Sequence, residues 1–480
     1  MATFSRSLDY LGGLKRRAVS ARSFRTVVNS KSGTKFNSGN SFQIDLPVIP
    51  RCFGDLANSY LMFDIKSTSS TTGDVGTLCS SGYDVINRIT VSSGGGAVIS
   101  DQQNVNRYIN AVFGLNTGHE WNQGYSAECL GHSGDYSPVG IDLPKQNEVA
   151  KRICLPLIGG VFSMDKLLLL DTALPLSITI YLEDYKNALF NDTGGSACDD
   201  YEVLDPRFVM NCTELSPEAM VVLNEAVGDM GFACNFTEVT CVTDKKPASA
   251  GSHITNLGMR HSSLNKITLL QYNSENLNNL AELSLSNRSW GYLEELHFTI
   301  NGVSYPQSHL KGSADNFSEF LTETLLANGS LGDTGANSSI NYIQKDTAIT
   351  TPGTMTADAA GGVLVANACN SLRLQIPTSS RNYETARGRF DNASIGNNLL
   401  TMDNVVDEFG TFLVAYDFSA FKTPADDSGL YSGVSSLAGN VTAELKYGAS
   451  GTFAMDLYFF SESDRILSID PVSRQHEVTD

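Results

Sequence analysis

Histidine and cysteine are the residues in this 480-residue chain whose chemistry would be easiest to recognise, since they bind metals and act as bases or nucleophiles. The seven histidines are dispersed, and none lies in a His-x-His or His-Glu-x-x-His pattern that would bring two ligands together. His297 lies in an alternating strand pattern, where a packed or solvated imidazole is the simpler interpretation. The nine cysteines include no Cys-x-x-Cys pair, so we expect reduced thiols that pack as small core residues, and no metal site.

Patterns typical of enzymes are also missing from the sequence. The acid pairs Glu294–Glu295 and Asp426–Asp427 are adjacent in sequence, and neighbours on a strand point to opposite faces, so neither suits a glycosidase. The glycines at 94–96 are not followed by the Gly-Lys-Ser/Thr of a phosphate loop, and no Gly-x-Ser-x-Gly elbow occurs. We therefore expect no enzymatic activity, no catalytic residue and no cofactor.

Charge separates the first 40 residues from the rest of the chain. Residues 1–40 contain eight Lys/Arg and one acid, a net charge of +7, while the remaining 25 basic and 51 acidic residues give −26. Such an arm can contact an anionic partner, namely nucleic acid, a membrane or the acidic surface of a neighbouring copy; the alternative is a merely solvated tail. An acidic body does not favour nucleic-acid binding by the main surface. The basic residues that we expect to make these contacts are Arg6, Lys15, Arg16, Arg17, Arg22 and Arg25.

No membrane-spanning or export signal is expected. The longest apolar runs fall short of about 18 residues, and the start lacks the apolar core of a secretory signal. We therefore expect a chain that is intracellular when it is made and is not exported by the secretory route.

Short alternating apolar runs, separated by Gly, Ser, Thr and Asn, predict a β-rich chain. Examples are the stretches SFQIDLP and YLMFDIK near the start and VTAELKY and FAMDLYFF near the end. A helix is predicted after the strand RFVMNC, with Ser216 as N-cap and Pro217 at the first helical position. Each half offers about eight strands, and eight antiparallel strands in two sheets make a jelly roll. We predict an all-β chain of two tandem eight-stranded jelly rolls with short inserted helices.

One pattern occurs twice, at Tyr83–Phe113 and at Tyr292–Leu326. In each copy a β-rich stretch, a turn and a helical stretch follow one another, and the apolar period changes from two to about 3.6 after the turn. The copies share almost no identical residues, so a chance similarity is the alternative to a duplication. We predict an arm over residues 1–40, a first jelly roll over 41–250 and a second over 251–480, with a long surface loop near 329–362.

Three stretches, in this order, resemble one viral family. They are a strand leading into a helix capped at Leu215–Glu218, the turn at Gly302 followed by Tyr305-Pro306-Gln307 and a helix, and an apolar strand with a turn at Asp464–Leu467 before a last short strand. Over roughly residues 41–475 the chain resembles double jelly-roll major capsid proteins, in particular those of polinton-like viruses and virophages. The residues after Gln307 depart from the second-proline pattern of relatives, and the basic arm has no counterpart in the family.

The resemblance implies a structural protein of a double-stranded DNA virus. Such proteins form homotrimers with a pseudo-hexagonal outline, and the trimers tile an icosahedral shell. The implied partners are further copies of the chain, neighbouring capsomers, penton and minor capsid proteins, and the genome or an inner membrane through the arm. The implied location is the virion capsid, assembled inside the host cell.

Two other classes of protein are also compatible with the sequence. One is a two-domain β-sandwich lectin or receptor-binding spike that recognises glycans through its loops, and the other is a jelly-roll glycosidase. A penton or minor capsid protein is a nearer alternative, although those usually contain a single jelly roll.

Overall fold

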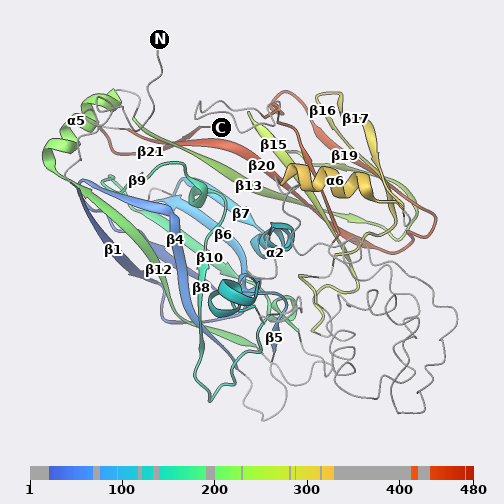
Figure 1. The fold of residues 1–480 in the computed structure, drawn as a ribbon, viewed down its shortest axis with the longest axis horizontal. Helices are drawn as coiled ribbons and strands as arrows, with labels where there is room; N and C mark the ends of the chain where they lie inside the picture. Colours follow the sequence, from blue (N-terminus) through green and yellow to red (C-terminus); the bar gives the residue numbers. More distant parts are fainter. Residues whose placement is uncertain are drawn as a thin grey trace, which may run out of the picture.

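The computed structural model describes residues 21–68, 76–94, 96–116, 122–132, 140–190, 200–228, 231–280, 283–286, 288–313, 316–328, 412–419, 433–470 and 472–479. These residues form two β-sandwich units arranged side by side, the first at the left of Figure 1 and the second at the upper right. No helix in the described ranges is both long and apolar enough to cross a membrane.

The first unit consists of two antiparallel sheets. Four long strands of one sheet lie in the spatial order β1 (Ala21–Asn29), β12 (Tyr201–Leu215), β4 (Cys52–Ser67) and β8 (Lys151–Pro156). Two short strands extend it: β2 (Lys35–Asn37) pairs with β12, and β9 (Leu168–Leu169) pairs with β4. The opposite sheet has the order β3 (Ser41–Asp45), β10 (Leu176–Leu182), β6 (Ile86–Ser93) and β7 (Val98–Gln103). A small separate sheet joins β5 (Thr77–Leu78) to β11 (Leu189–Phe190).

The second unit repeats this construction. Its first sheet has the order β13 (Phe232–Lys246), β20 (Met455–Ile469), β15 (Leu264–Asn273) and β18 (Leu413–Asp417), and β21 (His476–Thr479) pairs with β20. Its second sheet has the order β14 (Gly251–Asn256), β19 (Val441–Tyr447), β16 (Leu293–Ile300) and β17 (Val303–Lys311).

Both units follow one topology. When the eight long strands of each unit are numbered along the chain, the first sheet has the order 1-8-3-6 and the second sheet the order 2-7-4-5, in both units. The first strand thus pairs with the last, and the two middle strands form a hairpin. This is the eight-stranded jelly roll. The prediction of two tandem jelly rolls is confirmed.

Inward-facing side chains fill each sandwich, as the period-two patterns predict. In the first unit Phe63 and Ile65 of β4 share a core with Ile178 and Ile180 of β10, and all four are at most 2% exposed. In the second unit, the core joins β20 and β16 through Leu457, Phe459, Phe298 and Ile300.

The sequence repeat marks the same point in both units. The first copy covers β6, β7 and helix α2 (Val105–Asn116), and the second covers β16, β17 and helix α6 (Ser318–Ala327). Each copy is therefore the fourth strand, the fifth strand and the helix that follows. The sequence reading missed the fifth strand in both copies. The reason is that β7 and β17 lie at sheet edges and contain many polar residues, some of them buried, so their apolar alternation is weak.

The remaining helical segments are short. The predicted helix after β12 is present as α5 (Pro217–Val227), and the Ser216 hydroxyl accepts a hydrogen bond from Ala219 N at 3.3 Å. The others are α4 (Tyr185–Ala188), η2 (Gly82–Val85), η4 (Val161–Ser163) and the π-helical η3 (Asn122–Leu130).

Strand pairing moves the unit boundaries from their predicted positions. β13 pairs with β20 along its whole length, from Phe232↔Ile469 to Lys246↔Met455, although the sequence placed it in a first jelly roll ending at 250. On this pairing we place the change of unit at α5. β1 pairs with β12, so residues 21–29 form the first strand of the first unit, within the range 1–40 assigned to the arm.

Two further expectations concern the second half. β20 continues without interruption through the stretch Asp464–Leu467, where a turn was expected, because its pairing with β13 extends to Ile469. The predicted long loop at 329–362 lies outside the described residues.

Candidate functional site

The two jelly rolls are joined by a buried interface that contains both apolar and charged side chains. Four residues on the outer face of the β20–β15–β18 sheet, Leu270, Tyr272, Leu413 and Phe460, belong to one continuous core with the first unit. The ring of Tyr108 on α2 contacts the ring of Phe460, with 5.3 Å between their centroids. The second unit therefore buries the outer face of its β20–β15–β18 sheet against the first unit.

Arg107 of α2 lies at the centre of this interface. Its guanidinium carbon lies 4.6 Å from the ring centroids of both Tyr272 and Tyr458, and its Nη1 donates to the Ser284 carbonyl oxygen at 3.0 Å. The residue is 3% exposed. Cation–π attraction strengthens when the cation is removed from water, so the first unit inserts a cation into an aromatic slot of the second.

Charged groups make further contacts across the interface. The Tyr108 hydroxyl donates to Glu462 of β20, and Lys266 of β15 forms an ion pair with the same carboxylate at 2.6 Å. A buried carboxyl on β13, Glu238, accepts a hydrogen bond from Asp101 N of β7 at 2.9 Å. Burial raises the pKa of Glu238 to about 6. These directional contacts fix one orientation of the second unit on the first.

The predicted basic residues fall in two groups. Arg6, Lys15, Arg16 and Arg17 lie outside the described residues. Arg22 and Arg25 lie on β1 and are exposed.

These two arginines contact aromatic rings. The Arg22 guanidinium carbon lies 5.8 Å from the Phe24 ring centroid, and that of Arg25 lies 5.6 Å from the Tyr60 ring centroid. Arg25 also donates to the Tyr60 hydroxyl. Within the described ranges neither arginine forms an ion pair, so both charges remain available to a partner.

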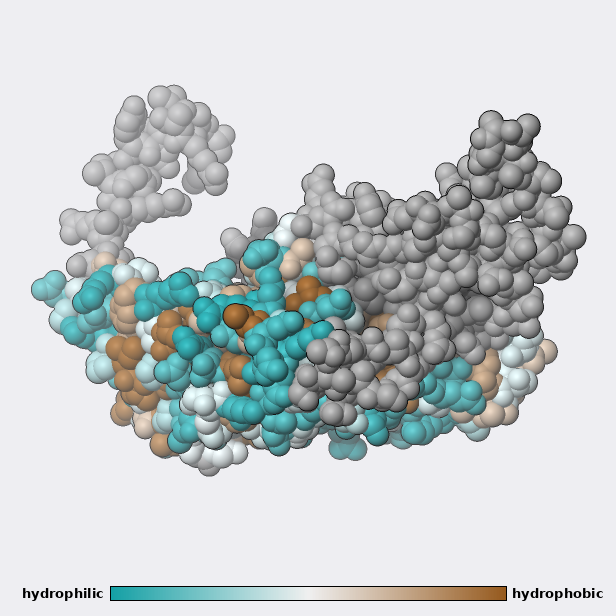
Figure 2. All heavy atoms as spheres, turned by 90° about the horizontal axis from the view of Figure 1, so that it is seen from below, coloured by the Kyte–Doolittle hydropathy of each residue, from teal (hydrophilic) through white to brown (hydrophobic). Residues whose placement is uncertain are grey.

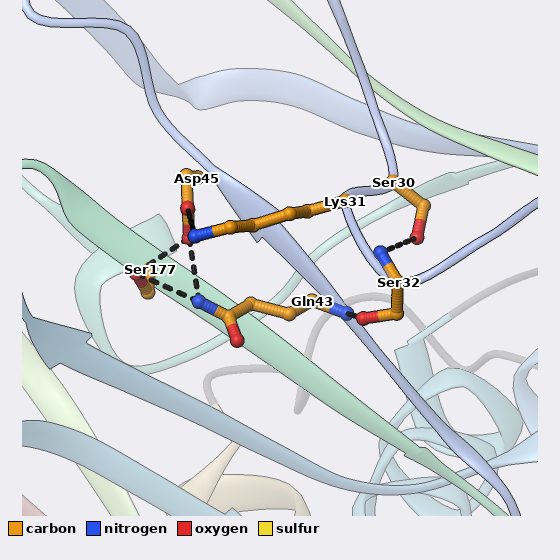
Figure 3. Close-up of polar contacts among 6 residues, drawn as sticks. All are labelled: Ser30, Lys31, Ser32, Gln43, Asp45 and Ser177. Atoms are coloured by element: carbon orange, nitrogen blue, oxygen red, sulfur yellow. Dashed lines mark hydrogen bonds and ion pairs between the residues drawn. The ribbon is translucent and has the colours of Figure 1, made fainter.

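Two lysines of the same basic region are engaged inside the chain. Lys31 forms an ion pair with Asp45 at 2.7 Å, and Lys35 forms one with the nearly buried Glu202 at 2.6 Å. Figure 3 shows how Gln43 and Ser177 also donate to Asp45, at 2.6 and 2.7 Å. These lysines hold the segment between β1 and β3 on the first unit, and they are not free to bind a partner.

Catalytic chemistry does not emerge from the side chains that the structure places. Among the described residues, no group of three or more His, Cys, Asp or Glu could hold a metal. The rings of His297 and His309 stack on neighbouring strands, with 3.8 Å between centroids, and each contacts a glutamate at 3.5 Å. This stacked pair was not expected, because the two histidines are twelve residues apart and on strands whose register the sequence does not give.

Sequence reasoning also missed Arg107 and Glu238. Arg107 lies within the predicted helix, where an arginine is ordinarily exposed, and its aromatic partners are more than 160 residues away. The only available signal is the period of about 3.6 in that helix, which puts Tyr108 on its apolar face, directly beside the charged Arg107.

Comparison with known proteins bears on the fold. No family model matches the sequence, and no curated protein matches it. Solved structures match over nearly the whole chain. VP54 of PBCV-1, fitted into a reconstruction of the virophage Sputnik, has a TM-score of 0.54 at 10% identity, covering 97% of this chain and 98% of its own.

Two further structures agree. The cryo-EM structure of the Sputnik virophage has a TM-score of 0.51 at 13% identity, covering 100% of this chain and 92% of that one. The Faustovirus major capsid protein has a TM-score of 0.52 at 7% identity, covering 94% and 91%. At such identities the likeness shows the fold, so the resemblance to double jelly-roll capsid proteins is confirmed at that level.

Proposed function

We propose that this chain is the major capsid protein of a double-stranded DNA virus of the polinton-like or virophage type. It forms homotrimeric, pseudo-hexagonal capsomers that tile an icosahedral shell. The observation that carries the proposal is the repeated strand order, 1-8-3-6 and 2-7-4-5, in two units joined by a buried interface. Two similar units per copy give a threefold assembly nearly sixfold edges, which suit a hexagonal lattice.

The proposal extends to partners and location. The chain binds further copies of itself and neighbouring capsomers in the virion capsid, which is assembled inside the host cell. Penton and minor capsid proteins fill the remaining positions of the shell. The basic arm contacts the genome, an inner membrane or an acidic neighbouring copy. No residue has a catalytic role.

Mass photometry of the purified chain tests the capsomer directly. The expected result is one species of three times 51.7 kDa, and negative-stain images should show particles with a pseudo-hexagonal outline. A stable monomer that binds immobilised glycans would contradict the proposal and favour a receptor-binding spike.

The role of the basic arm can now be tested without damaging the fold. Deletion of residues 1–20 leaves β1 in place, whereas deletion to residue 35 would remove a strand of the first jelly roll. We expect the shorter deletion to leave trimers intact and to reduce shell assembly, because it removes Arg6, Lys15, Arg16 and Arg17.

A length-matched variant separates charge from length. In it the same four residues are replaced by glutamine, and we expect the same loss of shells, scored by electron microscopy. Normal shells from both variants would mean that these residues have no part in assembly.

A further inference from the structure

The two equivalent helices differ in how they are covered. Both α2 and α6 follow the fifth strand of their unit. Arg107 and Tyr108 on α2 are at most 8% exposed, because the second unit packs over this side of the helix. On α6, by contrast, Ser318, Glu319, Thr322 and Leu326 are exposed, Leu326 by 43%. In Figure 1, α2 lies in the middle of the molecule between the two units, and α6 lies on the right.

The surface that covers α2 has a counterpart in the first unit. α2 packs against the outer face of the third and eighth strands of the second unit, through Tyr272 of β15 and Tyr458 and Phe460 of β20. The third and eighth strands of the first unit are β4 and β12. Among the described residues, no helix of the second unit packs against their outer face in the way that α2 packs against β15 and β20.

This outer face is partly apolar. The register aligns Val27 of β1, Val209 of β12, Tyr60 of β4 and Pro156 of β8 in one row across the sheet. Val27 is 47% exposed, and Tyr60 and its outward neighbour Met62 are half-buried. Figure 2, which views the molecule from below, shows hydrophobic residues interspersed with hydrophilic ones at the left end, where β1 lies in Figure 1. We call this surface the β1–β12–β4 face.

Charge on the two surfaces is complementary. Arg25 lies on β1 two residues before Val27 and on the same side of the strand, at the edge of the β1–β12–β4 face, and it forms no ion pair within the described residues. The exposed side of α6 presents Glu319 and Glu323, and it borders an open groove of about 620 Å³ that also contains Lys311 and Thr322. Opposite charges therefore lie on the β1–β12–β4 face and on the exposed side of α6.

We propose that the β1–β12–β4 face of one copy packs against the exposed side of α6 in the next copy, as the second unit packs against α2 within one chain. The proposal rests on the homotrimer proposed above and names the surfaces that join its subunits. Such a contact joins two different surfaces and is therefore head-to-tail, the kind that closes into a ring when the rotation permits. Each copy then supplies one contact within the chain and one contact between chains.

Charge reversal on each surface tests this contact. One variant carries Arg25→Glu, a second carries Glu319→Lys and Glu323→Lys, and a third, the combined variant, carries all three changes. Each of the first two places like charges opposite each other, so we expect the trimer fraction in mass photometry at nanomolar concentration to fall by at least about tenfold. The combined variant restores opposite charges on the two surfaces and is expected to recover trimers.

A matched control changes two exposed glutamates of another helix, Glu218→Lys and Glu225→Lys on α5. It carries the same change in net charge as the α6 variant and should leave the trimer fraction unchanged. Circular dichroism and melting curves establish that all variants remain folded.

The outcomes separate the two proposals. If the wild type and both charge-reversal variants form trimers equally well, the proposed contact is overturned and the capsid proposal stands. The contact would also be overturned if the α5 control lost its trimers as well, or if the combined variant did not recover them. In either case the effect would not be specific to these surfaces. A wild-type chain that is monomeric would instead overturn the proposed homotrimer.

Discussion

Replacement of Arg107 by alanine is expected to lower the free energy of unfolding by roughly 3 kcal/mol, since it removes a desolvated cation–π contact and a charged hydrogen bond. The guanidinium lies between the rings of Tyr272 and Tyr458 of the second unit. Truncation also leaves an unfilled space and an unpaired Ser284 carbonyl. Urea denaturation followed by tryptophan fluorescence and circular dichroism measures the loss.

Two companion variants make this result specific. Arg107→Met keeps most of the volume and lacks the donor and the charge, so we expect an intermediate loss if the cation itself contributes. Arg152→Ala removes an arginine that pairs with Asp64 on the surface, where its side chain is 59% exposed. That change should cost much less than Arg107→Ala, because water and salt screen an exposed ion pair. Equal losses for Arg107→Ala and Arg152→Ala would contradict the central role of Arg107.

The second large effect is a rise in stability as the solution becomes mildly acidic. Asp84 is fully buried at η2, where it accepts hydrogen bonds from Ser80 N, Ser81 N and Asn110 Nδ2. Burial outweighs these hydrogen bonds and raises the pKa of Asp84 to about 7, as it raises the pKa of Glu238 to about 6. Both carboxyl groups therefore bind a proton more tightly in the folded chain than in the unfolded one.

The direction of the effect follows from this difference. Folding takes up protons between the unfolded and folded pKa values, so the contribution of these groups is present at about pH 4–5 and is lost as the pH rises through 6 and 7. Between pH 8.5 and pH 5 the two groups together contribute a change in stability on the order of 4 kcal/mol. Unfolding midpoints measured from pH 8.5 to pH 5 should rise steadily. Asp84→Asn should remove most of the rise, and a flat profile for the wild type would contradict the assignment.

Stronger acid should reverse the trend. Burial alone would raise the pKa of Asp45, but hydrogen bonds from Lys31, Ser177 and Gln43 outweigh it and lower the pKa. Asp101 behaves in the same way, with Arg88 as its principal donor. Carboxylates of this kind stabilise the fold above their unfolded pKa and lose that contribution as the pH falls below about 4. The stability maximum therefore lies at mildly acidic pH.

Sequence periodicity identified most of the strands because their inward and outward positions differ sharply. β10 and β20 show the alternation that the two-sheet core requires, and the Ser-Pro start of α5 fixed the beginning of that helix. β7 and β17 were missed because a strand at a sheet edge that contains many polar residues resembles a loop in sequence. The first unit boundary was placed late because β13 has the same pattern whichever unit it joins, and only pairing with β20 decides.

The candidate site was predictable only in part. The basic region was visible from composition, and Arg22 and Arg25 are indeed exposed. Composition could not separate them from Lys31 and Lys35, whose partners Asp45 and Glu202 are brought close by the fold. Contacts between the two units join residues that are far apart in the sequence, and nothing in the spacing indicates them. Tyr108 and Glu462, for example, are more than 350 positions apart.

The pairing of first and last strands also sets the order in which the chain can fold during synthesis. β1 must wait for β12, so the first jelly roll can close only after about residue 215 has left the ribosome, and the second only after β20 at 455–469. Until then Arg107 and Tyr108 on α2 lack the surface that buries them. A half-made chain thus exposes a region that attracts unwanted association, and chaperone binding at this stage would protect it.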